Sequence, residues 1–354
     1  MRLTTPQQNI WNLQKFYEGT AIGNICGAIE YHETLDPEIA QQAIRHLVFT
    51  HDALRLEFSE DRGIPEQRIV STPATEAIQI MHFDSKREFE HYAEHIAKLP
   101  FDLIGRCLYK FVISFFGNET AILICLHHLI ADAWTVNLLA NHFDKTYREI
   151  IHSGAVPDFQ APSYTDILCS EEKYRNSPRY DKDRDFWEKR YQNAPSIAQI
   201  KLHGDSITPA TSQVTEEVAV ELSKKIRQYA DENHLTPALL FEAATMFYLS
   251  RINADAQNVT IGLMVLNRAT IAEKQTAGMG VSTIPFTATI DQDAPIKEVL
   301  QALNLERSTI YRHQRYPYSD ILQLVRERHE GINTLYDVLV SFQNATTGIN
   351  ASTE

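Results

Sequence analysis

The hydrophobic pattern of the first 150 residues switches repeatedly between the two-residue period of strands and the 3.6-residue period of helices. A helix is predicted to begin at Pro37, because Asp36 is a good capping residue and proline suits the first helical position. Further helices are predicted over residues 89–99 and 134–150, and strands over 53–58, 108–116 and 121–126. The last strand is an unbroken apolar run, which predicts burial inside a mixed α/β unit.

The second half of the chain shows the same mixture of helices and strands. Glycine and proline residues between 153 and 163 interrupt the periodicity and predict a linker. Beyond it, helices are predicted over residues 167–191, 222–229 and 236–249, and strands over 259–266, 281–290 and 335–342. The charged run 181–185 is predicted to be a solvated helix face. The sequence thus predicts two lobes, residues 1–165 and residues 166–354.

Composition narrows the class of protein. Of the 354 residues, 44% are hydrophobic and 22% are charged, as in globular proteins, and the formal net charge of −13 argues against nucleic acid as a partner. No apolar stretch approaches the ~20 residues that cross a bilayer, and the N-terminus lacks the apolar core of a signal peptide. The four cysteines are far apart without a C-x-x-C pair, so we expect reduced packing residues in a cytoplasmic protein.

The candidate chemistry lies directly after the apolar run 121–126, in the segment His127-His128-Leu129-Ile130-Ala131-Asp132-Ala133-Trp134. A histidine at a strand end, facing a helix start, is placed to move a proton near neutral pH. Adjacent histidines on a strand point to opposite faces, so they are poor joint metal ligands, and no His, Cys or Asp cluster suggests a metal site.

Asp132 has two interpretations that the sequence leaves open. It either caps the helix that begins near Ala133 or pairs with a distant arginine and holds the turn in shape. No serine or cysteine lies in a nucleophile elbow, and no glycine-rich phosphate loop is present. The sequence therefore favours direct transfer, in which a histidine assists attack by the substrate's own amine or hydroxyl.

The run from His127 to Asp132 resembles the HHxxxD signature of the condensation domains of nonribosomal peptide synthetases, which chloramphenicol acetyltransferases and related acyltransferases share. Further segments along nearly the whole chain are similar to this family in the same order: Thr5-Pro6-Gln7-Gln8, 51–58, Pro100-Phe101-Asp102-Leu103, Ile261-Gly262, Asn267-Arg268, His313-Gln314 and Ser341-Phe342-Gln343-Asn344. The resemblance implies an α/β (α+β) fold with mixed sheets, in which two chloramphenicol-acetyltransferase-like lobes form a V around an active-site tunnel.

The resemblance also implies roles for particular residues. His128 would be the active-site histidine and His127 its structural neighbour. Asp132 would shape the loop by pairing with Arg268, and Trp134 would pack beside it. The implied reaction is peptide-bond formation in secondary-metabolite biosynthesis. Donor and acceptor would be thioesters on the 4'-phosphopantetheine arms of two peptidyl carrier proteins, with an adenylation domain as neighbour and no intrinsic cofactor.

The chain departs from the family pattern at a few positions. Ala133 stands where glycine is usual, and its methyl group would crowd either the pantetheine arm in the tunnel or the amide that would face the thioester carbonyl. Gly280 and Ser282 replace a phenylalanine and an asparagine, which makes Ser282 a second candidate tunnel residue. The chain also stops soon after Asn344, so the second lobe is expected to be truncated at its C-terminus.

Three other functions remain open. The chain could be an HHxxxD acyltransferase that uses acyl-CoA or a soluble acceptor. It could be an epimerisation domain, although no additional acidic motif of that class is found. It could also be a catalytically degenerate module that docks carrier proteins, which Ala133 and the early stop would favour.

Overall fold

The computed structural model describes residues 1–354 except 73–76, 194, 196, 199, 201–211, 255 and 344–354. Asn344, the last residue of the resemblance, therefore lies outside the described residues. The described chain forms two compact units. The first is Met1–Lys173 together with Arg268–Val281, and the second is Tyr174–Asn267 together with the described residues 282–343. This division differs from a single break after residue 165, because a segment from the second half of the sequence belongs to the first unit.

The first unit is built around a four-stranded sheet. In spatial order its strands are β1 (Asn24–Tyr31), β6 (Glu119–His127), β5 (Tyr109–Phe116) and β4 (Ile78–His82). Strand β6 pairs antiparallel with β1 and β5, whereas β4 pairs parallel with β5. The unbroken apolar run therefore occupies a central strand, with a neighbour on each side.

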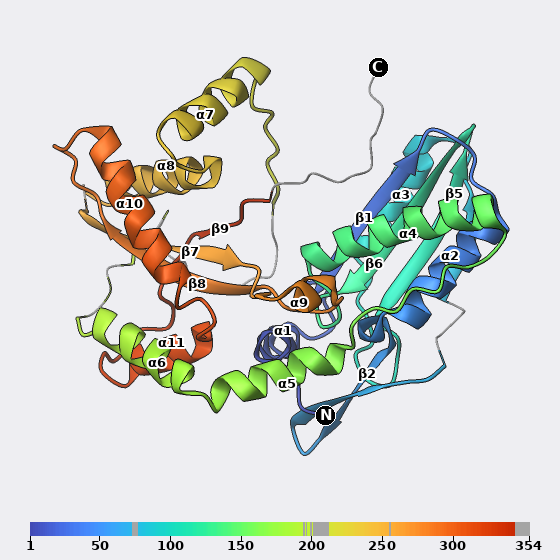
Figure 1. The fold of residues 1–354 in the computed structure, drawn as a ribbon, viewed down its shortest axis with the longest axis horizontal. Helices are drawn as coiled ribbons and strands as arrows, with labels where there is room; N and C mark the ends of the chain where they lie inside the picture. Colours follow the sequence, from blue (N-terminus) through green and yellow to red (C-terminus); the bar gives the residue numbers. More distant parts are fainter. Residues whose placement is uncertain are drawn as a thin grey trace. The chain divides into compact units, whose positions relative to one another are not determined.

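Strand β6 is buried because helices cover both faces of the sheet. Ile122, Ile124 and Leu126 belong to a core shared with α2 (Pro37–Thr50) and α4 (Ala133–Ser153). The alternate residues of β6 belong to a second core with Phe89 and Ile96 of α3 (Lys86–Ala97). Figure 1 shows the three helices beside the sheet. Neither face of β6 is exposed to solvent, so residues 121–126 are all hydrophobic and do not alternate with polar residues.

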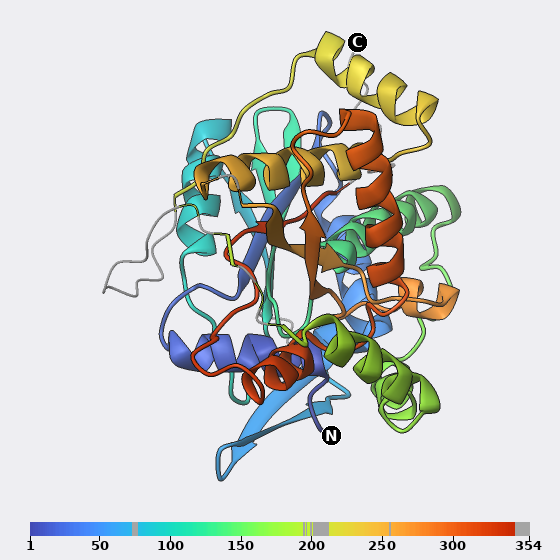
Figure 2. The same cartoon turned by 90° about the vertical axis from the view of Figure 1, so that its left-hand side faces the viewer.

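The first unit also contains α1 (Thr5–Phe16), α9 (Ile271–Gln275) and all but the last two residues of α5 (Tyr164–Arg175). A hairpin of β2 (Leu56–Asp61) and β3 (Ile64–Ile69) also belongs to it and projects at the bottom of Figure 2. The predicted strand 53–58 is only partly right, because Asp52–Arg55 is a 3-10 helix. That helix brings Arg55 into an ion pair with Asp52 three residues earlier.

The second unit has a three-stranded sheet in the order β8 (Ser282–Thr289), β7 (Asn258–Val265), β9 (Leu339–Val340). Its helices are α6 (Pro178–Arg190), α7 (Val220–Glu232), α8 (Pro237–Ile252), α10 (Ile296–Tyr311) and α11 (Tyr318–Arg326). The apolar faces of these elements share one core that contains Trp187, Met246 and Phe286.

Three predictions for the second half are corrected. The helix expected over 167–191 is two helices, because Pro178 cannot continue a helix but suits the first turn of α6. The strand expected over 335–342 shrinks to β9, and at the start of the expected range the Thr334 hydroxyl bonds the backbone of Tyr336 in a local turn. The charged run is not wholly solvated, since the Asp183 side chain is only 1% exposed.

The mixed α/β fold class is confirmed. The V-shaped arrangement of the lobes and the tunnel between them stay predictions. In the part of the chain that the structure describes, no helix has both the length and the apolar character needed to cross a membrane. All four cysteines are free thiols, but the expectation that each is a packing residue is wrong for Cys169, which is exposed.

Candidate active site

Strand β6 ends in a tight turn that carries the two histidines. The His127 N–H donates to the Leu108 carbonyl over 2.9 Å, and the His128 N–H donates to the Gly23 carbonyl over 2.7 Å, which ties the strand end to both neighbouring strands. The chain then turns, with the Ile130 N–H donating to the His127 carbonyl over 3.0 Å. The end of the sheet therefore sets the position of the histidine backbone.

His127 is buried and held as a neutral ring. Its Nδ1 accepts a hydrogen bond from the Leu129 N–H over 3.1 Å, so its proton is on Nε2, which donates to Oε1 of Gln14 over 3.1 Å. Burial, together with the neighbouring His128, lowers the pKa of His127 to about 3. A Cβ on Gly23 would lie 2.2 Å from Nε2, so glycine is needed beside the ring. His127 is thus a structural residue with both nitrogens engaged.

His128 is half-buried and differs in which nitrogen is engaged. Its Nδ1 lies 3.1 Å from the carbonyl oxygen of Ala131. A carbonyl only accepts, so Nδ1 carries the proton and the lone pair of the neutral ring lies on Nε2. Burial lowers the pKa of His128, although the Ala131 carbonyl and the nearby Asp132 oppose that shift. The ring is therefore neutral at pH 7, with Nε2 as its basic atom.

Asp132 fulfils both interpretations that the sequence left open, one with each oxygen. Its Oδ1 accepts from the Thr135 N–H over 2.9 Å and caps α4. Its Oδ2 accepts from Nη1 of Arg268 over 2.7 Å and from the N–H groups of Gly280 and Val281 over 2.9 and 3.0 Å. Burial alone would raise the pKa of Asp132, but these donors hold it below its usual value. This carboxylate is fully engaged and is not available as a base.

Arg268 brings a distant segment of sequence to the motif. Its Nη2 donates to the Gly278 carbonyl over 2.7 Å and lies 3.4 Å from the Thr135 hydroxyl, which itself donates to that carbonyl over 2.8 Å. A Cβ on Gly280 would lie 2.8 Å from the guanidinium. The glycine at this departure from the family pattern therefore leaves room for the arginine.

The remaining candidate residues are placed separately. Trp134 is 38% exposed, and its indole N–H donates to the Lys274 carbonyl over 2.8 Å. Ala133 is the half-buried first residue of α4. Ser282 is the first residue of β8 and belongs to the second unit. Roles for Ala133 and Ser282 in a tunnel stay predictions.

Two glutamines of α1 support the motif, and sequence reasoning gave neither a role there. Gln14 holds His127, and Nε2 of Gln7 donates to the Leu129 carbonyl over 2.9 Å. Both are buried with Trp11 on one face of the helix. The signal was the helical spacing of two amides with an aromatic residue, because amides on a buried face need hydrogen-bond partners.

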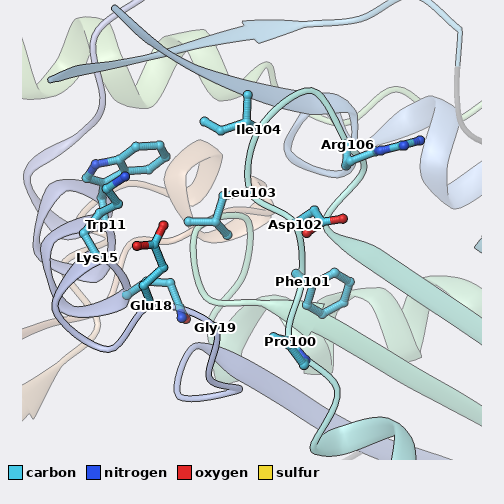
Figure 3. Close-up of a pocket in the computed structure, with 11 residues that line it drawn as sticks. Trp11, Lys15, Glu18, Gly19, Pro100, Phe101, Asp102, Leu103, Ile104 and Arg106 are labelled. Carbon is cyan, nitrogen blue, oxygen red and sulfur yellow. The ribbon is translucent and has the colours of Figure 1, made fainter. Parts of the chain in front are cut away.

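A cavity of about 390 Å³ lies behind the buried histidine, between α1 and residues 100–106. Figure 3 shows Trp11 and Lys15 on one side of it and Leu103 on the other. Gln14 and Phe101 line the cavity, and both also contact His127. Among the described residues, no group of three or more His, Cys, Asp or Glu is arranged to hold a metal ion.

A scan against protein-family models matches the whole chain, residues 1–354, to the model described as the condensation domain. The chain belongs to the condensation-domain family. It is 27% identical to surfactin synthase subunit 1 from Bacillus subtilis and 25% identical to tyrocidine synthase 2 from Brevibacillus parabrevis. The two matches cover 96% and 97% of this chain but only 10% and 9% of the relatives. The chain thus spans about a tenth of the length of these curated relatives.

Solved structures of condensation domains share the fold. The first condensation domain of the calcium-dependent antibiotic synthetase, in complex with a substrate analogue, aligns with a TM-score of 0.84 at 19% identity. That match covers 96% of this chain and 79% of the other. The starter condensation domain of rhizomide synthetase, a double mutant in complex with C8-CoA and Leu-SNAC, aligns with a TM-score of 0.83 at 21% identity. It covers 96% and 77% of the two chains. The architecture is therefore that of a condensation domain.

Proposed function

We propose that this condensation-family chain joins an aminoacyl or peptidyl donor to an aminoacyl acceptor through an amide bond. Both substrates would be thioesters on the 4'-phosphopantetheine arms of peptidyl carrier proteins, supplied by a neighbouring adenylation domain. The relatives are synthases of which this chain matches one segment, which supports partners of this kind. The observation that carries the proposal is the hydrogen bond from Nδ1 of His128 to the Ala131 carbonyl, because it leaves Nε2 as a base.

In the proposed reaction, the acceptor amine attacks the carbonyl carbon of the donor thioester. A C–N bond forms, the tetrahedral intermediate collapses, and the C–S bond breaks. Nε2 of His128 takes the proton that the amine nitrogen loses and returns it to the departing thiolate. Proton balance is then closed within the site, with no covalent enzyme intermediate. General-base help of this kind is worth about 10²–10⁴-fold in rate.

Asp132 and Arg268 would position the base without touching substrate. Their ion pair holds the start of α4 against residues 278–281, and this fixes the loop whose Ala131 carbonyl orients His128. Orientation of donor and acceptor contributes separately, since positioning alone can lower a barrier by up to ~7–11 kcal/mol. The two contributions are separable by experiment, because only one of them needs the imidazole.

A condensation assay with two loaded carrier proteins tests the proposal. His128→Ala should lower the single-turnover rate of amide formation by about 10²–10⁴-fold. His32→Ala is the matched control, since it removes an imidazole whose side chain is 67% exposed and should leave the rate unchanged. Circular dichroism of each variant checks folding. Amide formation at nearly the native rate by His128→Ala would remove the base role and leave positioning as the source of catalysis.

A second candidate is an acyltransferase that takes its donor from free acyl-CoA. The rhizomide starter domain with the same fold was solved with C8-CoA, which favours testing this donor. Product formed from octanoyl-CoA without a donor carrier would support it. In the same assays, inverted donor stereochemistry would identify an epimerisation domain. Carrier binding without any turnover would identify a docking module.

A further inference from the structure

Two of the four cysteines lie directly opposite each other on neighbouring strands. Cys26 of β1 pairs with Cys125 of β6 in the antiparallel register. Three positions away in the same register, the His128 N–H donates to the Gly23 carbonyl, so Gly23 and His128 form a hydrogen-bonded pair. Because the two pair types alternate, Cys26 and Cys125 form a non-hydrogen-bonded pair. Such pairs have Cα atoms about 4.5 Å apart with their side chains closest, within the range that a disulfide spans.

Both thiols point to the face of the sheet that α3 covers, and they differ in exposure. Cys125 is buried in the core with α3, and Cys26 packs against that core but stays half-exposed. Strand β1 is at the edge of the sheet, and Ala28, two residues along on the same face, is exposed. A small solute can therefore reach Cys26 from the edge, whereas Cys125 is buried.

We propose that Cys26 and Cys125 are a redox pair that closes to a cross-strand disulfide on reaction with a low-molecular-weight disulfide. The Cys26 thiolate attacks one sulfur of the small disulfide, forms a mixed disulfide and releases one small thiol. Cys125, as its thiolate, then attacks the Cys26 sulfur, forms the intramolecular S–S bond and releases the second small thiol. The small disulfide is reduced to two thiols, and the protein loses two hydrogens.

The electrostatics of the pair favour this order of attack. A hydrogen bond from the Cys125 thiol lowers the pKa of Cys26, although burial opposes the shift. The same hydrogen bond raises the pKa of Cys125, and burial adds to that effect. The accessible sulfur is thus the one that ionises more readily, and the thiolate is the reactive form.

The first experiment uses the unmutated chain, so no substitution can disturb folding. Wild-type protein is incubated with glutathione disulfide under native conditions, denatured, alkylated and mapped by mass spectrometry. We expect a linked pair of peptides containing Cys26 and Cys125, with no glutathione on either residue. Cys169, which is exposed on α5, reports that the reagent is active by acquiring glutathione.

Single variants assign the two roles, in a background that carries Cys107→Ser and Cys169→Ser. Cys125→Ser should stop at a mixed disulfide on Cys26, and Cys26→Ser should leave Cys125 alkylatable. The proposal is overturned if both cysteines of the wild-type protein remain alkylatable once Cys169 is fully modified. It is also overturned if each carries its own glutathione. The readout is chemical, so it does not depend on condensation activity.

Discussion

Removal of the Arg268 guanidinium tests whether its ion pair with Asp132 holds the motif together. Both side chains are only 1% exposed, and the pair is joined over 2.7 Å. Arg268→Ala leaves a buried carboxylate without its counter-charge, which costs about 3–5 kcal/mol in proteins. Asp132 keeps hydrogen bonds from the N–H groups of Thr135, Gly280 and Val281. We therefore expect the lower end, about 3 kcal/mol less free energy of unfolding for the first unit.

Urea unfolding followed by circular dichroism measures this loss. Arg148→Ala is a matched control on α4, because Arg148 pairs with Asp144 four residues earlier and its side chain is 63% exposed. Pairs at the surface contribute about 0.2–1 kcal/mol, so the control should unfold almost like the wild type. If Arg268→Ala costs no more than Arg148→Ala, burial does not make the Asp132–Arg268 pair more stabilising than a surface pair.

The pH dependence of the unfolding free energy tests the same ion pair independently. In the wild type, the folded-state pKa of Asp132 is below its unfolded value of about 3.9, so its stabilisation is present above that value and is lost as pH falls further. Without Arg268, we expect burial to raise the folded-state pKa of Asp132 above its unfolded value. Protonation of Asp132 at lower pH then removes the unpaired buried charge and restores part of the lost stability. The difference in unfolding free energy between variant and wild type should therefore narrow from pH 7 to pH 4. A difference that widens would refute the assignment.

Three further predictions concern the strand end. The rate of amide formation should lose activity only as pH falls below about 6.5, since the pKa of His128 is lowered from that value, and His128→Ala should lack this acid limb in a pH–rate profile. Gly23→Ala would place Cβ 2.2 Å from Nε2 of His127 and should lower the thermal midpoint, whereas Gly27→Ala, with open space around its Cβ, should not. Ala133→Gly should cost up to about 1 kcal/mol in unfolding free energy. It should also raise the condensation rate, and an unchanged rate would contradict the crowding of the pantetheine arm.

Local sequence signals placed most elements because each acts over a few residues. The capping residue Asp36 with Pro37 predicts the start of α2, and the structure has that helix capped by the Asp36 side chain. The apolar run predicted β6, whose buried position needs no long-range information beyond its hydrophobicity. The same reasoning placed His128 at a strand end, from which the base could be proposed.

Local sequence patterns do not predict burial when the residue that covers a side chain is far along the chain. Asp183 sits in a run of charges that suggests solvent, yet it accepts hydrogen bonds from the Tyr174 hydroxyl and from His313, 130 residues away. Periodicity reports which side of a helix is charged but not which distant residue covers it. A buried carboxylate and an exposed one therefore give the same local pattern.

The sequence by itself determined the order of helices and strands and the two histidines at the end of β6, because hydrophobic period and capping chemistry are local. Only the tertiary structure decided what each histidine does. The Leu129 N–H and Gln14 occupy both nitrogens of His127, whereas the Ala131 carbonyl occupies one nitrogen of His128. Tautomer and pKa depend on hydrogen-bond partners and burial, and folding brings those partners together from distant parts of the chain.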